Sequence, residues 1–260
     1  MTTTANDKKS ANTESIGKRM MHAIGAENLS LIIALVLMVA LIATQTEFFF
    51  SARNLFNIAQ NMAVVGLIAV GMTLVIVSAG LDISVGSIAG CASVVCALVV
   101  VSTGSVLGGI AMSLCVGLVL GAVNATIISI LRVNPVVATL ATFSAFRGVA
   151  FLIAPEGRPI GVLDPTFAQL GSGRLFRVGE FPGIPIAFVI LVVVATAAHF
   201  VMRSTVFGRS IYSMGGNPVA ARLAGINLTR MRFYIYAISG ALSGLAGAIV
   251  TARTSSGQPA

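Results

Sequence analysis

Four polar residues lie in or beside long apolar stretches, where any chemistry would take place away from bulk water. Asp82 and Ser84 belong to the segment Gly-Leu-Asp-Ile-Ser-Val-Gly (80–86), while Asn124 and Arg147 lie within later apolar runs. Polar groups at membrane depth often line the path of a transported solute. Glycine-interrupted helices serve the same purpose in transporters. We therefore expect these four residues to contribute to a translocation path.

Each of the four also has a structural interpretation. Asp82 or Ser84 could cap the helix that follows the glycines, where a carboxylate stabilises the helix by about 0.3–1 kcal/mol. Arg147 lies in the outer half of its run, from which its side chain can reach the membrane surface. Asn124 could form a hydrogen bond between helices. The residue types alone leave both interpretations open.

The sequence contains no recognisable catalytic or metal-binding cluster. His22 and His199 are far apart, and the three cysteines lie within apolar runs at spacings that match no metal site. A nucleotide-hydrolysing P-loop needs a lysine after its glycine-rich turn, and no lysine follows Lys18. We expect a protein that is not an enzyme and that needs no cofactor.

The composition predicts an integral membrane protein. The chain has 260 residues, of which 57% are hydrophobic and 9% charged. A soluble domain carries about 25% charged residues. The formal net charge of +8 is concentrated in the N-terminal tail and in turns between apolar runs. This distribution is typical of the positive-inside rule and argues against a nucleic-acid partner.

The lengths of the apolar runs predict an all-α polytopic fold with about seven crossings. The expected spans are 29–44, 58–78, 85–101, 106–131, 136–153, 184–202 and 233–252. A helix break is expected near 80–86. Residues 28–260 would form one transmembrane domain behind a polar tail at 1–27.

Charge counts in the connecting segments predict the orientation. Loop 203–232 carries five arginines and no acidic residue, whereas loop 154–183 has equal numbers of basic and acidic residues. The positive-inside rule then places the N-terminus and loop 203–232 in the cytoplasm, and loop 154–183 outside.

The sequence predicts a short helix within the cytoplasmic loop. Asn217 can cap its N-terminus, and Pro218 suits the first helical position. Gly225 can adopt the left-handed conformation that ends a helix. So short a helix is unstable alone in water, so it must dock against something. It is either a capped surface turn or an element that carries force from a partner into the membrane.

Three stretches resemble the permease subunit of sugar ATP-binding-cassette importers of the ribose, xylose and arabinose type. They are GMTLVIVSAGLDISVGS (71–87), VNPVVATLATFSAFRGVAF (133–151), and FGRSIYSMGGNPVAARLAGI with SGALSGLAGAIVTARTSSGQP (207–259). Members more often have Gly-Gly where this chain has Ala79-Gly80. The resemblance covers roughly residues 48–259.

The resemblance implies a division of labour in a bacterial inner membrane. A periplasmic sugar-binding protein would deliver a monosaccharide, two permease copies would form the path, and a cytoplasmic ATP-binding subunit would drive transport. It also makes the short helix the ATPase-coupling element. The implied coupling residues are Gly216, Asn217, Pro218, Ala221, Arg222 and Gly225.

One departure from the resemblance and two other hypotheses remain. Family members usually continue with further spans where this sequence stops at Ala260, so we expect a truncated product or a fragment. A non-transporting truncated permease is therefore one alternative. A secondary transporter or channel is the other, and it would use Asp82 for ion coupling.

Overall fold

The computed structural model of the protein describes residues 26–179 and 181–259. Contacts divide the chain into a unit of residues 1–55 and a unit of residues 56–260, with the boundary inside helix α3. The expected tail, residues 1–27, lies outside the described part except for its last two residues. Glu180 also lies outside it.

The first unit contains helix α2 (Ala26–Gln45) and the start of α3 (Ala52–Val77). Between them, the Asn54 side-chain amide donates to the Phe49 carbonyl at 2.8 Å and so closes the turn. The Phe49 and Phe50 rings meet edge to face, with centroids 5.1 Å apart. The segment that contains Phe49 and Phe50 is therefore a compact turn.

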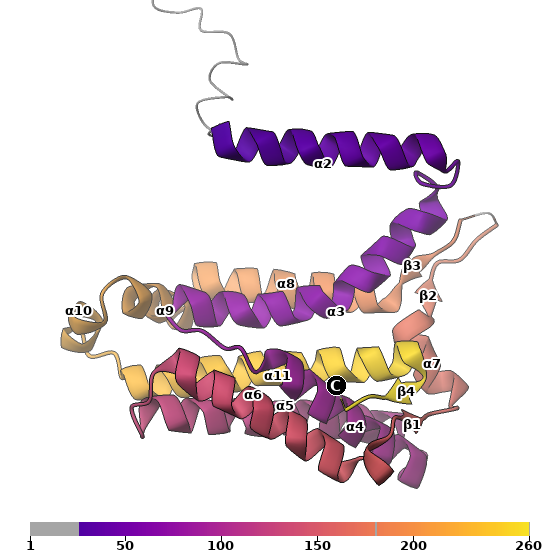
Figure 1. Ribbon diagram of the computed structural model, residues 1–260. Helices are drawn as coiled ribbons and strands as arrows, with labels where there is room; N and C mark the ends of the chain where they lie inside the picture. Colours follow the sequence, from indigo (N-terminus) through magenta and orange to yellow (C-terminus); the bar gives the residue numbers. More distant parts are fainter. Residues whose placement is uncertain (1–25, 180, 260) are drawn as a thin grey trace, which may run out of the picture. The chain divides into compact units, whose positions relative to one another are not determined.

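The second unit is a helical bundle with two small antiparallel ribbons (Figure 1). Besides α3, its helices are α4 (Val85–Thr103), α5 (Val106–Ser129), α6 (Pro135–Ile153), η1 (Pro155–Gly157), α7 (Pro165–Ser172), α8 (Ile186–Ser204), α9 (Val206–Gly216), α10 (Pro218–Leu223) and α11 (Leu228–Thr254). Strand β1 (Ile160–Gly161) pairs with β4 (Ser256–Gly257), and β2 (Arg174–Leu175) pairs with β3 (Ile184–Pro185).

The predicted all-α polytopic fold is confirmed. Within the described residues, the helices long and apolar enough to cross a membrane are α3, α4, α5, α6, α8 and α11, which makes six. The first expected span, 29–44, is also helical. Its apolar helical stretch, Leu29–Gln45, is shorter than each of the six helices named above. The predicted helix break is present, because α3 ends at Val77 and α4 begins at Val85.

Local capping explains why several helices begin where they do. Helices α6, α7 and α10 each start with an Asn-Pro or Asp-Pro pair, in which the first side chain accepts from backbone amides of the first turn. Asn227 caps α11 by accepting from the Arg230 amide at 3.0 Å. Helix α11 therefore begins five residues before the expected span start, Phe233, and Arg230 and Arg232 lie in its first turns rather than in a loop.

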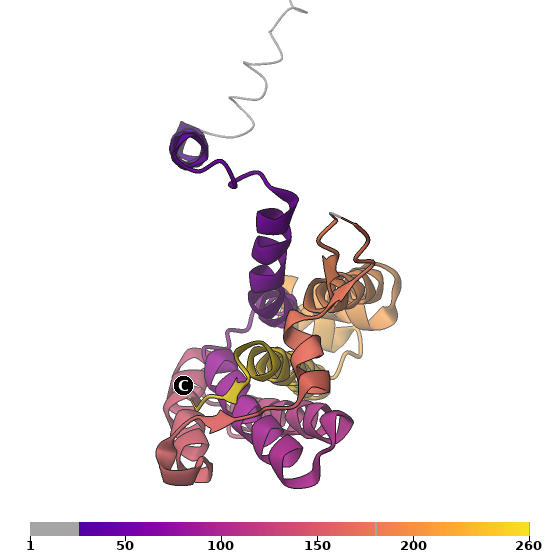
Figure 2. The same ribbon diagram turned by 90° about the vertical axis from the view of Figure 1, so that its right-hand side faces the viewer.

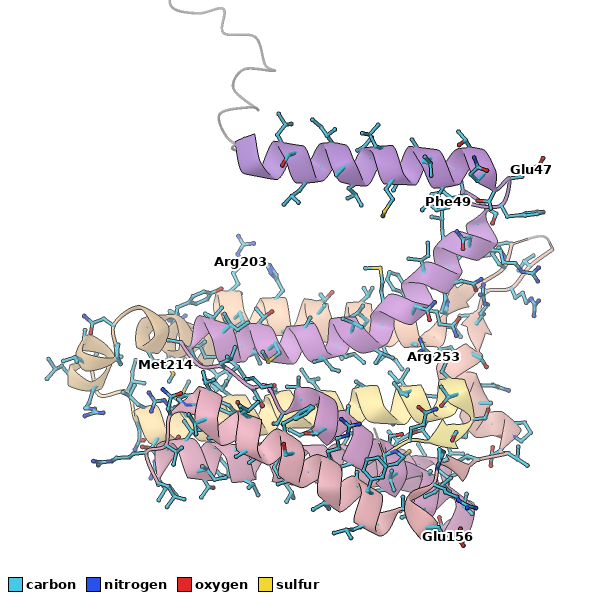
Figure 3. The ribbon with its side chains drawn as sticks, viewed as in Figure 1. Glu47, Phe49, Glu156, Arg203, Met214 and Arg253 are labelled. Atoms are coloured by element: carbon cyan, nitrogen blue, oxygen red, sulfur yellow. The ribbon has the colours of Figure 1, made fainter. Side chains whose placement is uncertain are left out.

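The two ends of the bundle differ in their elements. Figure 1 shows α9, α10 and the α5–α6 turn at one end, which we call the α10 end. Helix α7 and the two ribbons lie at the other end, which we call the α7 end. Stretch 154–183, expected as a polar loop, forms η1, β1, α7 and β2 there. In Figure 3, Met214 lies toward the α10 end and Glu156 and Arg253 toward the α7 end.

Helix α11 occupies the centre of the bundle and packs most extensively against α5 (Figure 2). A Cβ atom on Gly117 of α5 would overlap the carbonyl oxygen of Gly240 of α11, and one on Gly244 would overlap the carbonyl oxygen of Ser113. The Ser113 hydroxyl donates to the Gly244 carbonyl at 2.7 Å. The small-residue spacing in α5 and α11 thus marks a backbone contact, as in other membrane helix pairs.

We predict that Gly240→Val destabilises the bundle by about 1–3 kcal/mol, because its side chain would have to push α5 away. Thermal unfolding of the purified protein in detergent measures the change. Gly148→Val in α6 is the matched control, since a Cβ there meets nothing within 4 Å. Equal shifts in melting temperature for the two variants would contradict the close α5–α11 contact.

Candidate functional site

The break between α3 and α4 is held in an unusual backbone conformation. Ala79 has a positive φ of 58°, and the Gly80 amide donates to the Val75 carbonyl at 2.9 Å. A Cβ on Gly80 would lie 2.8 Å from the Tyr236 hydroxyl oxygen. Position 80 therefore accepts only glycine without rearrangement. The chain then passes into the bundle before α4 begins.

Asp82 is the centre of a buried hydrogen-bond network within this break. Its Oδ1 accepts from the Ser84 hydroxyl at 2.6 Å and from the Ser84 amide at 2.9 Å. The Asn124 side-chain amide of α5 donates to Ser84 Oγ at 2.7 Å and lies 3.5 Å from Asp82 Oδ1. Asp82 is 1% exposed, and Ser84 and Asn124 are fully buried. We call these three residues the Asp82 network.

Tyr236 of α11 joins the same region. Its hydroxyl donates to the Leu81 carbonyl at 3.1 Å, directly beside Asp82. Tyr236 itself is 1% exposed. The break is thus attached to α5 through Asn124 and to α11 through Tyr236. Within the described residues, Asp82 Oδ2 and Asn124 Oδ1 are buried and have no hydrogen-bond partner, so the network keeps unused acceptors.

The helix-capping interpretation of the break is only partly matched. Ser84 occupies the N-cap position of α4, but its side chain makes no cap hydrogen bond. Asp82 instead accepts from Ser84, before the first helical residue. The interhelical role considered for Asn124 is present, because Asn124 connects α5 to the break.

Arg147 lies away from this network. It is exposed on α6, and its guanidinium carbon is 6.0 Å from the centroid of the Phe151 ring. Among the described residues the one ion pair joins Arg158 and Glu156, so Arg147 does not pair with Asp82. The structure brings three of the four predicted path residues together and leaves Arg147 outside.

The expected short helix is present with the capping chemistry read from the sequence. Asn217 Oδ1 accepts from the Val219 and Ala220 amides, both at 3.0 Å. Gly225 has φ of +84°. The amides of Gly225 and Ile226 donate to the carbonyls of Arg222 and Ala221, both at 3.0 Å, which closes a Schellman motif. The structure begins the helix at Pro218 and ends it at Leu223.

Helices α9 and α10 are packed onto the ends of the membrane helices. A Cβ on Gly215 of α9 would overlap the carbonyl oxygen of Val77, the last residue of α3. Ala221 of α10 is buried in a core cluster that also contains Met214 and Tyr236. The short helix is thus joined through packed side chains to the residue that holds Leu81.

The comparisons with known proteins agree with this architecture. The family described as "Branched-chain amino acid transport system / permease component" matches residues 54–260. This chain belongs to that permease family. No solved structure matches it significantly.

Curated relatives support the expected resemblance to sugar importer permeases. The ribose import permease protein of Haemophilus influenzae is 37% identical over 87% of this chain and 69% of its own length. That of Bacillus subtilis is 36% identical over 93% and 74%. The L-arabinose transport system permease protein of Escherichia coli K12 is 34% identical over 79% and 61%. The chain is a multi-pass membrane protein of a family of transport permeases rather than enzymes.

Two features were missed from the sequence alone, one in the site and one at the α7 end. Tyr236 was not singled out, although a tyrosine inside a glycine-rich apolar run is a reason to look for a hydrogen-bond partner. Helix α7 was also missed, although Asp164-Pro165 carries the same start signal as Asn217-Pro218. That signal was sufficient to predict α7.

We predict that Asp82→Ala destabilises the protein by about 1–3 kcal/mol, because it leaves the buried hydroxyl and backbone amide of Ser84 without their acceptor. Asp82→Asn should cost less, since it keeps an acceptor oxygen for Ser84. Thermal unfolding in detergent reports both changes.

Glu156→Ala is the control for Asp82→Ala. It removes a carboxylate whose side chain is 74% exposed in a surface ion pair, and such pairs contribute little. If Asp82→Ala were as stable as Glu156→Ala, the Asp82 network would not hold the break in place.

Proposed function

We propose that this chain is the transmembrane component of an ATP-binding-cassette importer that translocates a monosaccharide. The substrate class we favour is a pentose such as ribose, xylose or arabinose. The observation that carries this proposal is the similarity to ribose and arabinose permeases over most of the bundle. A separate cytoplasmic ATPase would drive transport, and a periplasmic binding protein would supply the sugar.

The charge distribution supports a cytoplasmic α10 end. Its arginines are Arg132, Arg203, Arg209, Arg222, Arg230 and Arg232. No acidic residue lies among the described residues of 130–134 and 203–232. Basic residues are retained on the cytoplasmic side of membrane proteins. We therefore propose that the N-terminus and the segment 203–232 are cytoplasmic and that 154–183 faces the periplasm of a bacterial inner membrane.

We propose that the ATPase docks on α10 and its neighbours. The coupling residues would be Gly216, Asn217, Pro218, Ala221, Arg222 and Gly225. Ala221 faces the core, whereas Arg222 is exposed and free to meet an acidic surface. A push on α10 would reach the Asp82 region along two routes: α9 against the Val77 carbonyl, and Ala221 through the core cluster to Tyr236.

The translocation path would run beside the break between α3 and α4, with Asp82, Ser84 and Asn124 on its wall. All three are buried, so sugar could reach them only after the helices around the break separate. Arg147, which lies outside the Asp82 network, would contribute separately from the exposed face of α6. Such separation driven from α10 is a form of alternating access.

We further propose that a second permease copy completes the path. Helix α8 is apolar, yet only 11% of its most apolar stretch is buried within the chain. Exposed apolar helix surface in a membrane protein faces lipid or another membrane subunit. A homodimer or heterodimer embedded in lipid accounts for this exposure.

The orientation is tested with single cysteines in a variant whose native cysteines are replaced. Leu163, near the α7 end, is 94% exposed, and Leu223 of α10 is 85% exposed. We expect a membrane-impermeant thiol reagent to label Leu163→Cys in intact spheroplasts and Leu223→Cys only after the membrane is opened. The reverse pattern would overturn the proposed orientation.

The transport proposal is tested by uptake of labelled pentoses in cells that lack other pentose importers. We expect uptake to require this chain, an ATPase subunit and a binding protein. Arg222→Glu should weaken co-purification with the ATPase by at least about tenfold and lower uptake, because it reverses the charge at the docking surface.

Arg158→Glu at the α7 end is the control for this charge reversal and should retain ATPase association. Normal co-purification of Arg222→Glu would refute the docking site. Uptake without any ATPase would instead indicate a secondary transporter, and no uptake with all partners present would indicate a non-transporting permease.

A further inference from the structure

Three arginines line one pocket at the α10 end. The cavity has a volume of about 500 Å³, and its lining includes Arg132, Arg222, Arg232, Ser129, Asn134 and Thr229. Sites for small ligands typically occupy about 300–1,000 Å³. The arginines come from the α5–α6 turn, α10 and α11, so the tertiary fold assembles the pocket. We call it the arginine pocket.

The positive charge of the pocket is not neutralised within the described part of the chain. No acidic side chain lines it, and the one ion pair among the described residues lies elsewhere, between Arg158 and Glu156. The pocket also borders Pro135 and Leu228, the first residues of α6 and α11. Helix N-termini add partial positive charge and favour anions.

The surroundings of the pocket are apolar and exposed. Ile130 and Leu131, which precede Arg132, are 65% and 66% exposed, and Val136 and Val137 at the start of α6 are 43% and 61% exposed. These positions adjoin the end of α5 and the start of α6, where membrane spans terminate. A cationic pocket beside exposed apolar side chains at this level matches a phosphate head group with its acyl chains alongside.

We propose that the arginine pocket is a binding site for a phosphate group, supplied by an anionic phospholipid head group or by free phosphate. Guanidinium groups form bidentate hydrogen bonds with phosphate oxygens, and Ser129, Asn134 and Thr229 add polar contacts. The site is distinct from the Asp82 network and from the proposed path. It shares only Arg222 with the proposed ATPase-coupling residues.

The test uses the purified, delipidated full chain and native mass spectrometry with palmitoyl-oleoyl phosphatidylglycerol, the matching phosphatidylcholine and inorganic phosphate. We expect preferential retention of phosphatidylglycerol. The Arg132→Gln/Arg232→Gln variant should bind it about 30-fold more weakly, since each cation near a lipid head group contributes a factor of about five. Arg222 is left unchanged so that ATPase docking is not altered directly.

Two matched variants make the result specific. Arg158→Gln/Arg177→Gln removes the same charge from exposed positions near the α7 end and should bind phosphatidylglycerol like the original protein. Arg132→Lys/Arg232→Lys keeps the charge but loses the bidentate geometry, so it should bind more weakly than the original protein and more tightly than the glutamine variant. This lysine variant also shows whether loss of binding follows charge rather than misfolding.

The outcomes separate the sources of phosphate. Selective loss of phosphatidylglycerol in the glutamine variant supports the lipid, and binding of inorganic phosphate alone, lost in the same variant, supports the free anion. Equal binding by the glutamine variant and the original protein overturns the proposal. Failure of both probes to bind the original protein also overturns it. Loss of ATPase co-purification by the glutamine variant would then identify the pocket as a protein-docking surface. Failure here would leave the transport proposal standing.

Discussion

The close contact between the backbones of α5 and α11 is the constraint on which the rest of the bundle depends. Glycines at the crossing let the helices meet without intervening side chains, and the Ser113 hydroxyl adds a hydrogen bond across them. A Cβ on Gly121 would overlap the Tyr236 carbonyl oxygen, and Asn124 lies one turn further along α5. The contact that joins the helices therefore also brings Asn124 and Tyr236 to the Asp82 region.

The break between α3 and α4 is stable because it is held from several directions. A non-helical segment inside a membrane bundle must find partners for its polar groups within the protein. Here the Leu81 carbonyl receives the Tyr236 hydroxyl, and Asp82 receives Ser84. Such a segment can change conformation when its attachments move. In the proposed transport cycle, this segment would respond to force applied at α10.

The α10 end combines two kinds of surface with different physical requirements. Arg222 is exposed on α10, where it suits a protein partner in water, and it also lines the arginine pocket, whose other members lie beside apolar side chains at the ends of α5 and α6. Anion binding and partner docking would therefore occur on adjacent surfaces. The α7 end carries both acidic and basic residues and two small ribbons, whereas segment 203–232 at the α10 end carries no acidic residue.

The sequence by itself determined features that depend on neighbouring residues. The lengths of apolar runs predicted the six long spans closely, since a membrane requires that length whatever the contacts. Asn217, Pro218 and Gly225 predicted a capped short helix because a cap involves only adjacent amides. The same local chemistry was present at Asp164 and would have revealed α7.

Only the tertiary structure decided which distant residues meet. Asp82 and Asn124 are 42 positions apart, and Leu81 and Tyr236 are 155 apart. No local pattern fixes such pairs, because they follow from the depth and rotation of packed helices. For the same reason the sequence could not separate Arg147 from Asp82 or show that arginines of three elements share one pocket. Helix formation is a local property here, whereas the site is a product of packing.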